Sequence, residues 1–184
     1  MDAGHLRRVG ALGAVTALGA FGLASVGASA ETAERATTKT ISMEQQGNQL
    51  FFAGPARVKR GAELEIINNT NPRNVGPHTF SIVKKDELPT TNRQQRRCFR
   101  GDNVCVRIAE AHRFNFQTGE VNRNPVFAGK RGWNKGFGKR GDSWYSEEKR
   151  EVFGQPVKKK AGKTLFYLCA IHPEMQGKIK VARR

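Results

Sequence analysis

Side chains that bind soft metals are scarce in this 184-residue chain, which has only three Cys, four His and three Met. An odd number of cysteines means that disulfide bonds within one chain cannot pair them all. No Cys stands directly after the apolar N-terminal segment, which argues against a lipoprotein anchor. The chain also has no internal repeat and no low-complexity tract long enough to form a disordered tail.

Acidic residues are in short supply as well. The chain has 16 Asp and Glu against 32 Lys and Arg, so its formal net charge is +16. Such an excess indicates attraction to acidic partners, anionic lipids or other polyanions, and it carries no information about the fold. A basic surface that is simply solvated is an equally weighted alternative.

The first 30 residues have the pattern of a secretory signal. Arg7 and Arg8 precede an uncharged stretch, Val9 to Ala30, which ends in A-S-A. This pattern predicts cleavage after Ala30 and export to a periplasm or the cell exterior. An uncleaved membrane anchor is the alternative. The five glycines of the stretch and its A-S-A end favour cleavage, so no stable membrane insertion is expected afterwards. The Arg-Arg pair does not decide between Sec and twin-arginine export.

Residues 31–184 have the length of a single domain. Short segments rich in β-branched and aromatic residues recur between turn signals, and little of the chain looks helical. Glu63 and Glu65 alternate with Leu64 and Ile66, as in a strand with one wet face. The sequence therefore predicts an all-β sandwich or barrel. The segments expected to be strands are K-T-I-S-M, Q-L-F-F, A-E-L-E-I-I-N, H-T-F-S-I-V, T-L-F-Y-L-C and G-K-I-K-V.

A long basic insertion, residues 84–150, interrupts this pattern. It carries 16 Lys and Arg against 8 Asp and Glu, and its strand signals (C-V-R-I, R-F-N-F and N-P-V-F) are weak. Aromatic residues interleave with its basic ones, a feature of single-stranded nucleic-acid binding. They are Trp133, Phe137, Trp144 and Tyr145. We favour an ordered loop whose aromatics pack against the sandwich, so no nucleic-acid partner is expected.

Two of the three cysteines are close neighbours in the insertion. Cys98 and Cys105 flank a Gly-Asp-Asn turn, which favours a disulfide bond between them. Export to an oxidising compartment permits such a bond. Cys169 is then the unpaired thiol, and a bound metal would protect it.

The segment L-C-A-I-H-P-E-M places Cys169, His172 and Met175 at even three-residue intervals. Such a pattern should arise by chance in about one of a thousand chains of this composition. A thiolate, an imidazole and a thioether together suit copper, and a second His would complete the donor set of a blue copper centre. His78 lies where a turn-rich loop enters a strand and is the favoured second His. His112 is interpreted as an ordinary surface residue.

The C-terminal run T-L-F-Y-L-C-A-I-H-P-E-M-Q-G-K-I-K-V, together with P-H-T-F, resembles the cupredoxins, the blue (type 1) copper proteins. The short ligand loop is most similar to that of pseudoazurin and amicyanin. The resemblance implies a cupredoxin-like Greek-key β-sandwich that binds one type 1 copper ion through His78, Cys169, His172 and an axial Met175. The chain departs from the family in the 84–150 insertion and in Thr79, where several members have Asn. A hydrogen bond from Thr79 between the ligand loops is an open possibility.

These features predict an exported carrier of single electrons rather than an enzyme. The sequence shows no second metal cluster and no Ser–His–carboxylate constellation for nucleophilic catalysis. The expected partner is a redox protein with an acidic docking surface. Two alternatives stay open. One is a copper-binding or copper-delivery protein, and the other is a surface interaction module with a structural copper site.

Overall fold

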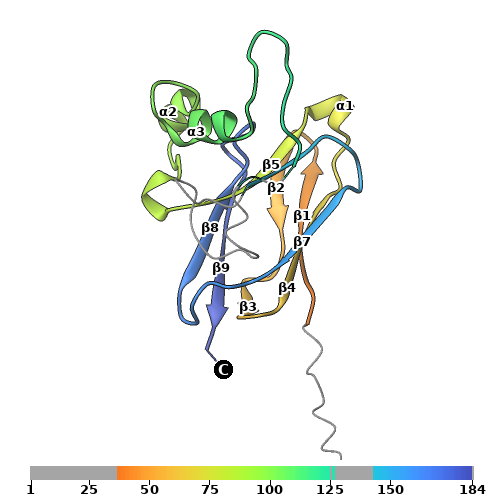
Figure 1. Cartoon of the computed structure of the whole chain (residues 1–184), viewed down its shortest axis with the longest axis vertical. Coiled ribbons are helices and arrows are strands. Elements are labelled where there is room, and N and C mark those ends of the chain that lie inside the picture. The colour runs from red at the N-terminus through yellow and green to blue at the C-terminus, as the bar shows by residue number, and fades with distance from the viewer. Residues whose placement is uncertain (1–36, 125, 127–142, 184) are drawn as a thin grey trace, which may run out of the picture. The chain divides into compact units, whose positions relative to one another are not determined.

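The computed structural model describes residues 37–124, 126 and 143–183 (Figure 1). The expected signal segment, residues 1–30, lies outside the described residues. So does the part of the insertion that contains Trp133 and Phe137. No helix within the described ranges is both long and apolar enough to cross a bilayer.

Nine strands of the described residues form two sheets. The first sheet has four strands in the order β2-β1-β4-β7, and the second has five in the order β3-β9-β8-β5-β6. Pairing is antiparallel except between β1 and β4 and between β3 and β9. The strands are β1 (Lys39–Gln46), β2 (Gln49–Ala53), β3 (Arg57–Lys59), β4 (Glu63–Asn68), β5 (His78–Val83), β6 (Ser143–Ser146), β7 (Val152–Pro156), β8 (Thr164–Leu168) and β9 (Gln176–Ala182).

The main core is formed by alternate residues of both sheets, as expected for a β-sandwich. In β4 the predicted alternation is present, with Leu64 and Ile66 buried and Glu63 and Glu65 partly exposed. The other buried apolar side chains of this core include Ile41 and Met43 of β1, Phe80 and Ile82 of β5, Leu165 and Tyr167 of β8, and Ile179 and Val181 of β9. The all-β sandwich predicted from the sequence is thus confirmed.

Strand β5 is buried along its whole length, because a second core covers its other face. This core joins Val83 of β5 and Leu168 of β8 to Cys98, at the end of one helix of the insertion, and to the buried residues of the next helix. The helices are α2 (Asn92–Arg97) and α3 (Val104–Ala111), and the 3-10 turn η1 (Lys85–Glu87) precedes them. The insertion therefore packs on the outer face of the second sheet, on which α2 and α3 lie in Figure 1.

The strand signals inside the insertion were largely misleading. The segment C-V-R-I, one of these weak signals, lies in helix α3. The buried residues of α3 fit one helix face, because Ile108 lies four positions after Val104 and three after Cys105. Within R-F-N-F no strand forms, and Val126 of N-P-V-F makes an isolated bridge to Ser143.

Apart from the end residues Ala62 and Cys169, the expected strand segments all fall in observed strands, whereas β3, β6 and β7 were not expected. The turn-rich segment 68–77 contains one short helix, α1 (Pro72–Val75), capped by the Asn71 side chain. Strand β6 lies within the 84–150 insertion but pairs with β5, and its Trp144 and Tyr145 are buried.

The predicted disulfide bond between Cys98 and Cys105 is present and links the end of α2 to the first turn of α3. We expect the double variant Cys98→Ala/Cys105→Ala to lose about 2–3 kcal/mol of unfolding free energy, because the bond closes a short loop in the unfolded chain. The loss is measured by urea unfolding of three samples: the variant, the oxidised natural protein and the reduced natural protein. A reductant should destabilise the natural protein by a similar amount and leave the variant unchanged. An equal response of both proteins to the reductant would contradict the assignment.

Candidate metal centre

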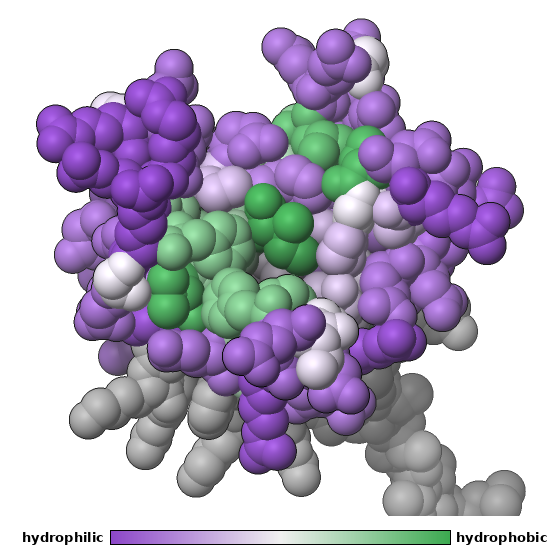
Figure 2. Space-filling model, turned by 90° about the horizontal axis from the view of Figure 1, so that it is seen from above, coloured by the Kyte–Doolittle hydropathy of each residue, from purple (hydrophilic) through white to green (hydrophobic). Residues whose placement is uncertain are grey.

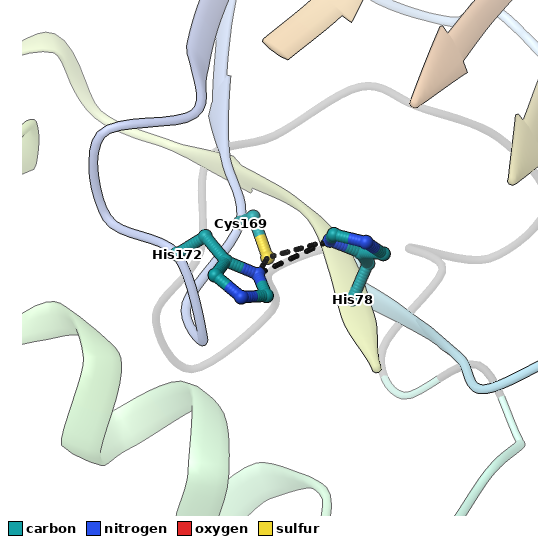
Figure 3. A group of neighbouring side chains, drawn as sticks. All are labelled: His78, Cys169 and His172. Atoms are coloured by element: carbon teal, nitrogen blue, oxygen red, sulfur yellow. Dashed lines mark hydrogen bonds between the residues drawn. The ribbon is translucent and has the colours of Figure 1, made fainter. Parts of the chain in front are cut away.

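Three potential metal ligands meet at one end of the sandwich, between β5 and the loop that joins β8 to β9. His78 is the first residue of β5, Cys169 directly follows β8, and His172 lies three residues further on in the loop (Figure 3). His78 and Cys169 are fully buried, and His172 is partly exposed. The strand pairing of β5 with β8 brings together residues that are 91 positions apart in the sequence.

The three donor atoms form a compact triangle. The Cys169 Sγ atom lies 3.8 Å from His78 Nδ1 and 3.7 Å from His172 Nδ1, and the two Nδ1 atoms are 3.2 Å apart. The common centre of three atoms at these separations lies about 2.1 Å from each. Metal–nitrogen and metal–sulfur bonds are roughly 2.0–2.3 Å long. The donor set thus fits a small metal ion without rearrangement, and two imidazoles with a thiolate suit copper.

The ring of His78 is held in the tautomer that a metal requires. Its Nε2 atom lies 2.9 Å from the Thr70 hydroxyl, which itself donates to the Asn68 side-chain oxygen at 2.7 Å. Because that hydroxyl proton is committed to Asn68, Thr70 must accept from Nε2–H. The lone pair of Nδ1 therefore faces Cys169. Asn68 is fixed in turn by donating to Ser146 at 2.9 Å. Neither Thr70 nor Asn68 was identified from the sequence, where both lie in an ordinary turn-rich segment.

The thiol of Cys169 is surrounded by hydrogen-bond donors. The Thr79 backbone N–H donates to Sγ at 3.3 Å, and the Thr79 hydroxyl accepts from the Ala170 N–H at 2.8 Å. Burial raises the pKa of Cys169 to about 11, although hydrogen bonds from Thr79, Ile171 and His172 oppose this shift. Without a metal the group is therefore a protonated thiol at neutral pH.

Burial also controls the protonation of the two imidazoles. It lowers the pKa of His78 to about 4, with a further contribution from the neighbouring His172. Burial likewise lowers the pKa of His172, against the opposing effects of Glu174 and of a hydrogen bond with the Val75 backbone. Both rings are consequently neutral at pH 7 and are ready to bind a metal.

Met175 lies close to these residues along the loop. Its N–H donates to the His172 carbonyl at 2.8 Å, and its carbonyl accepts from the Cys169 N–H at 3.0 Å. The side chain is fully buried in the main core. These backbone bonds close the loop into a tight turn, while the role of Met175 as axial ligand stays a prediction.

His112 is not the surface residue that the sequence predicted, because only 1% of it is exposed. The residue caps the C-terminus of α3, and its ring nitrogens lie 2.9 Å from the Asn122 carbonyl and 2.8 Å from the Ser143 hydroxyl. The prediction failed because the flanking charges Glu110 and Arg113 suggested exposure. The helix turns His112 inward, toward the outer face of the second sheet. His112 does not belong to the His78–Cys169–His172 cluster.

An apolar cavity of about 370 Å³ adjoins the loop that carries the cluster. Ala170 and Ile171 of the loop form one wall, and side chains of the insertion form the other, including Phe99, Phe114 and Phe116. Phe116 is 67% exposed, an unusual value for a large apolar side chain. Figure 2 shows the face seen from above in Figure 1, where apolar side chains gather in a hollow bordered by hydrophilic residues.

Two sheets in this strand order, with a His–Cys–His cluster at one end of the sandwich, agree with what the resemblance to the cupredoxins implies. The fold is that of the cupredoxins. The family resemblance stated from the sequence is therefore supported, while the narrower likeness to pseudoazurin and amicyanin stays a prediction.

Comparison with solved structures finds cupredoxin-like chains of low sequence identity. Auracyanin A, a "blue" copper protein from Chloroflexus aurantiacus, is 19% identical with a TM-score of 0.43, covering 79% of this chain and 98% of its own. Auracyanin B is 15% identical with a TM-score of 0.44, covering 80% and 90%. The copper protein rusticyanin is 18% identical with a TM-score of 0.34, covering 78% and 76%. No protein-family model matches the chain, and no curated protein matches it.

The ionisation of the cluster predicts how many protons a metal displaces. Between pH 7 and 9 we expect binding of one Cu(I) ion to release one proton, because Cys169 is a thiol with a pKa of about 11 and the imidazoles are already neutral. A pH indicator in weakly buffered, oxygen-free solution measures the release. The variant Cys169→Ala should release none. Release of two protons, or of none from the natural protein, would show that the cluster is ionised differently.

Proposed function

We propose that the protein is an exported blue copper protein that carries single electrons. The observation that carries the proposal is the triangle of His78, Cys169 and His172, with separations suited to one metal ion. Met175 is the proposed axial ligand. Copper bound there would supply a one-electron Cu(I)/Cu(II) couple.

The residues around the ligands are arranged to keep them in place during electron transfer. Thr70 and Asn68 hold the ring of His78, while Thr79 joins its strand to the ligand loop. A rigid site that suits both oxidation states rearranges little when an electron moves, which favours rapid transfer. Tightly packed, hydrogen-bonded ligands also oppose release of the ion, so they favour an electron carrier over a delivery protein.

His172 is the proposed point of electron exchange. It is the ligand with partial exposure, and it lies on the same loop as Ala170 and Ile171, which line the apolar cavity. Small and apolar residues around an exposed ligand permit close approach of a partner. Residues 91–124, several of which line the same cavity, contain seven Arg and three acidic residues. We therefore propose a redox partner with an acidic docking surface.

The proposed location is a periplasm or the exterior of the cell. It is supported by the signal-like sequence of residues 1–30 and by the Cys98–Cys105 disulfide bond, which is typical of oxidising compartments.

A copper-loaded protein with the proposed site should show an intense thiolate-to-copper absorption band in the visible region. Cys169→Ala should abolish this band because it removes the thiolate, and Met175→Leu should keep the band but shift the reduction potential. The matched control Thr118→Ala changes a distant exposed residue and should leave both unchanged. A band that persists in Cys169→Ala would refute the assignment. Rapid loss of copper to a chelator would instead favour a delivery protein.

The proposed basic docking face predicts how charge affects electron exchange. We expect oxidation of the Cu(I) protein by anionic hexacyanoferrate(III) to slow severalfold as salt rises from 10 to about 300 mM, because the attraction is screened. Arg73→Glu should slow the reaction at low salt, because Arg73 is exposed on α1 beside Val75, whose backbone contacts His172. Lys180→Glu, an exposed position near the end of β9, is the control. Equal effects of the two variants would mean that net charge alone matters.

A further inference from the structure

A buried chain of hydroxyl groups runs from the insertion to the candidate copper ligand Cys169. Ser143 Oγ lies 2.8 Å from His112 Nε2 and 2.6 Å from Ser81 Oγ. Ser81 donates to Thr79 Oγ1 at 3.2 Å, and Thr79 in turn contacts Ala170 and Cys169 as described above. Each of the four side chains, His112, Ser143, Ser81 and Thr79, is at most 3% exposed.

The register of the second sheet explains how these hydroxyl groups come together. Ser81 of β5 lies directly opposite Ser143 of β6, and Thr79 is two residues from Ser81 on the same face of β5. This is the outer face of the second sheet, and the insertion covers it. The neighbouring part of the same face is apolar, because Val83 there packs against Ile108 of α3.

Four buried polar groups are costly in this setting unless all of them have partners. An apolar strand surface would pack against the insertion at least as well. Packing therefore does not explain why these polar groups are buried here.

His112 determines which groups donate and which accept along the hydroxyl chain. The Asn122 carbonyl can only accept a hydrogen bond, so His112 donates to it from Nδ1–H. Burial lowers the pKa of His112, which keeps the ring neutral, so Nε2 must accept the Ser143 proton. Ser143 is then available to accept from Ser81. A single Ser81 proton thus serves both Ser143 and Thr79. The Thr79 hydroxyl also accepts from the Ala170 N–H, and the Thr79 N–H donates to Cys169 Sγ, so the hydroxyl chain ends at the copper ligand.

We propose that His112 is a positioning residue for the copper site, acting through Ser143, Ser81 and Thr79 on the sulfur of Cys169. The inference rests on the proposed copper site. Hydrogen bonds at a ligating sulfur tune the reduction potential of the metal, and residues that orient ligands commonly act at this distance. The insertion thereby acts on the reduction potential without supplying a ligand.

The test replaces His112 with Leu, which fills similar space and accepts no hydrogen bond. In copper-loaded His112→Leu we expect a lower midpoint potential and a shifted thiolate-to-copper band. The lower potential should appear as at least a threefold fall in the ratio of reduced to oxidised protein at equilibrium with a mediator of known potential. His112→Gln, whose side chain can accept from Ser143, should restore most of the natural value. Ile108→Ala is the matched control, because it loosens the same packing around α3 without touching the hydroxyl chain.

A double-mutant cycle distinguishes a connected chain from separate local effects. Ser81→Ala should shift the potential in the same direction as His112→Leu, and the double variant should shift it no further. Additive shifts would overturn the proposal. So would equal shifts in Ile108→Ala and His112→Leu, because both would then reflect packing alone.

A measurement on the metal-free protein separates failure of this proposal from failure of the copper site. Amide hydrogen exchange of Thr79 and Ala170 should be several times faster in His112→Leu than in Ile108→Ala, because both amides bond to groups at the end of the chain. Faster exchange without any thiolate-to-copper band in the natural protein would support the connection and refute the copper centre. Unchanged exchange together with an unchanged potential in His112→Leu would overturn the role of His112.

Discussion

Two hydrogen bonds of Thr79 connect the halves of the candidate metal centre. Its N–H donates to Cys169 Sγ, and its hydroxyl accepts from the Ala170 N–H. His78 stands next to Thr79 on β5, while Cys169 and His172 lie on the loop after β8. The triangle of donor atoms therefore depends on these bonds, together with the pairing of β5 and β8. Because both bonds are buried, water does not compete for them.

The insertion is a structural part of the sandwich rather than an appendage. Its helices α2 and α3, joined by the disulfide bond, cover the outer face of the second sheet, and its strand β6 extends that sheet beside β5. As a result β5 is buried on both faces. One face contributes Phe80 and Ile82 to the main core, and the other carries the hydroxyl groups that reach His112. The same insertion supplies aromatic walls to the cavity beside the ligand loop.

The electrostatics of the site follow from this burial. Desolvation keeps both imidazoles neutral and Cys169 protonated at neutral pH, so the metal-free site holds no net charge that the protein interior would have to stabilise. A metal ion that displaces the thiol proton would bring its own positive charge to balance the thiolate. None of the basic residues in the described ranges is buried, so their effect is on encounter with other molecules.

Several features of the protein were determined by the sequence alone. Alternating and β-branched segments predict the main strands because side chains on a strand point alternately to its two faces, and the even spacing of Cys169, His172 and Met175 predicts a loop site because it combines three scarce residue types. Local patterns could not predict the role of His112, the helical state of C-V-R-I or the hydrogen bonds by which Asn68 and Thr70 hold His78. The contacts of His112, and the bond from Asn68 to Ser146, join residues 10 to 78 positions apart that meet only in the folded protein. Flanking charges made His112 look exposed, and only the packing of α3 on the second sheet decided that it is buried.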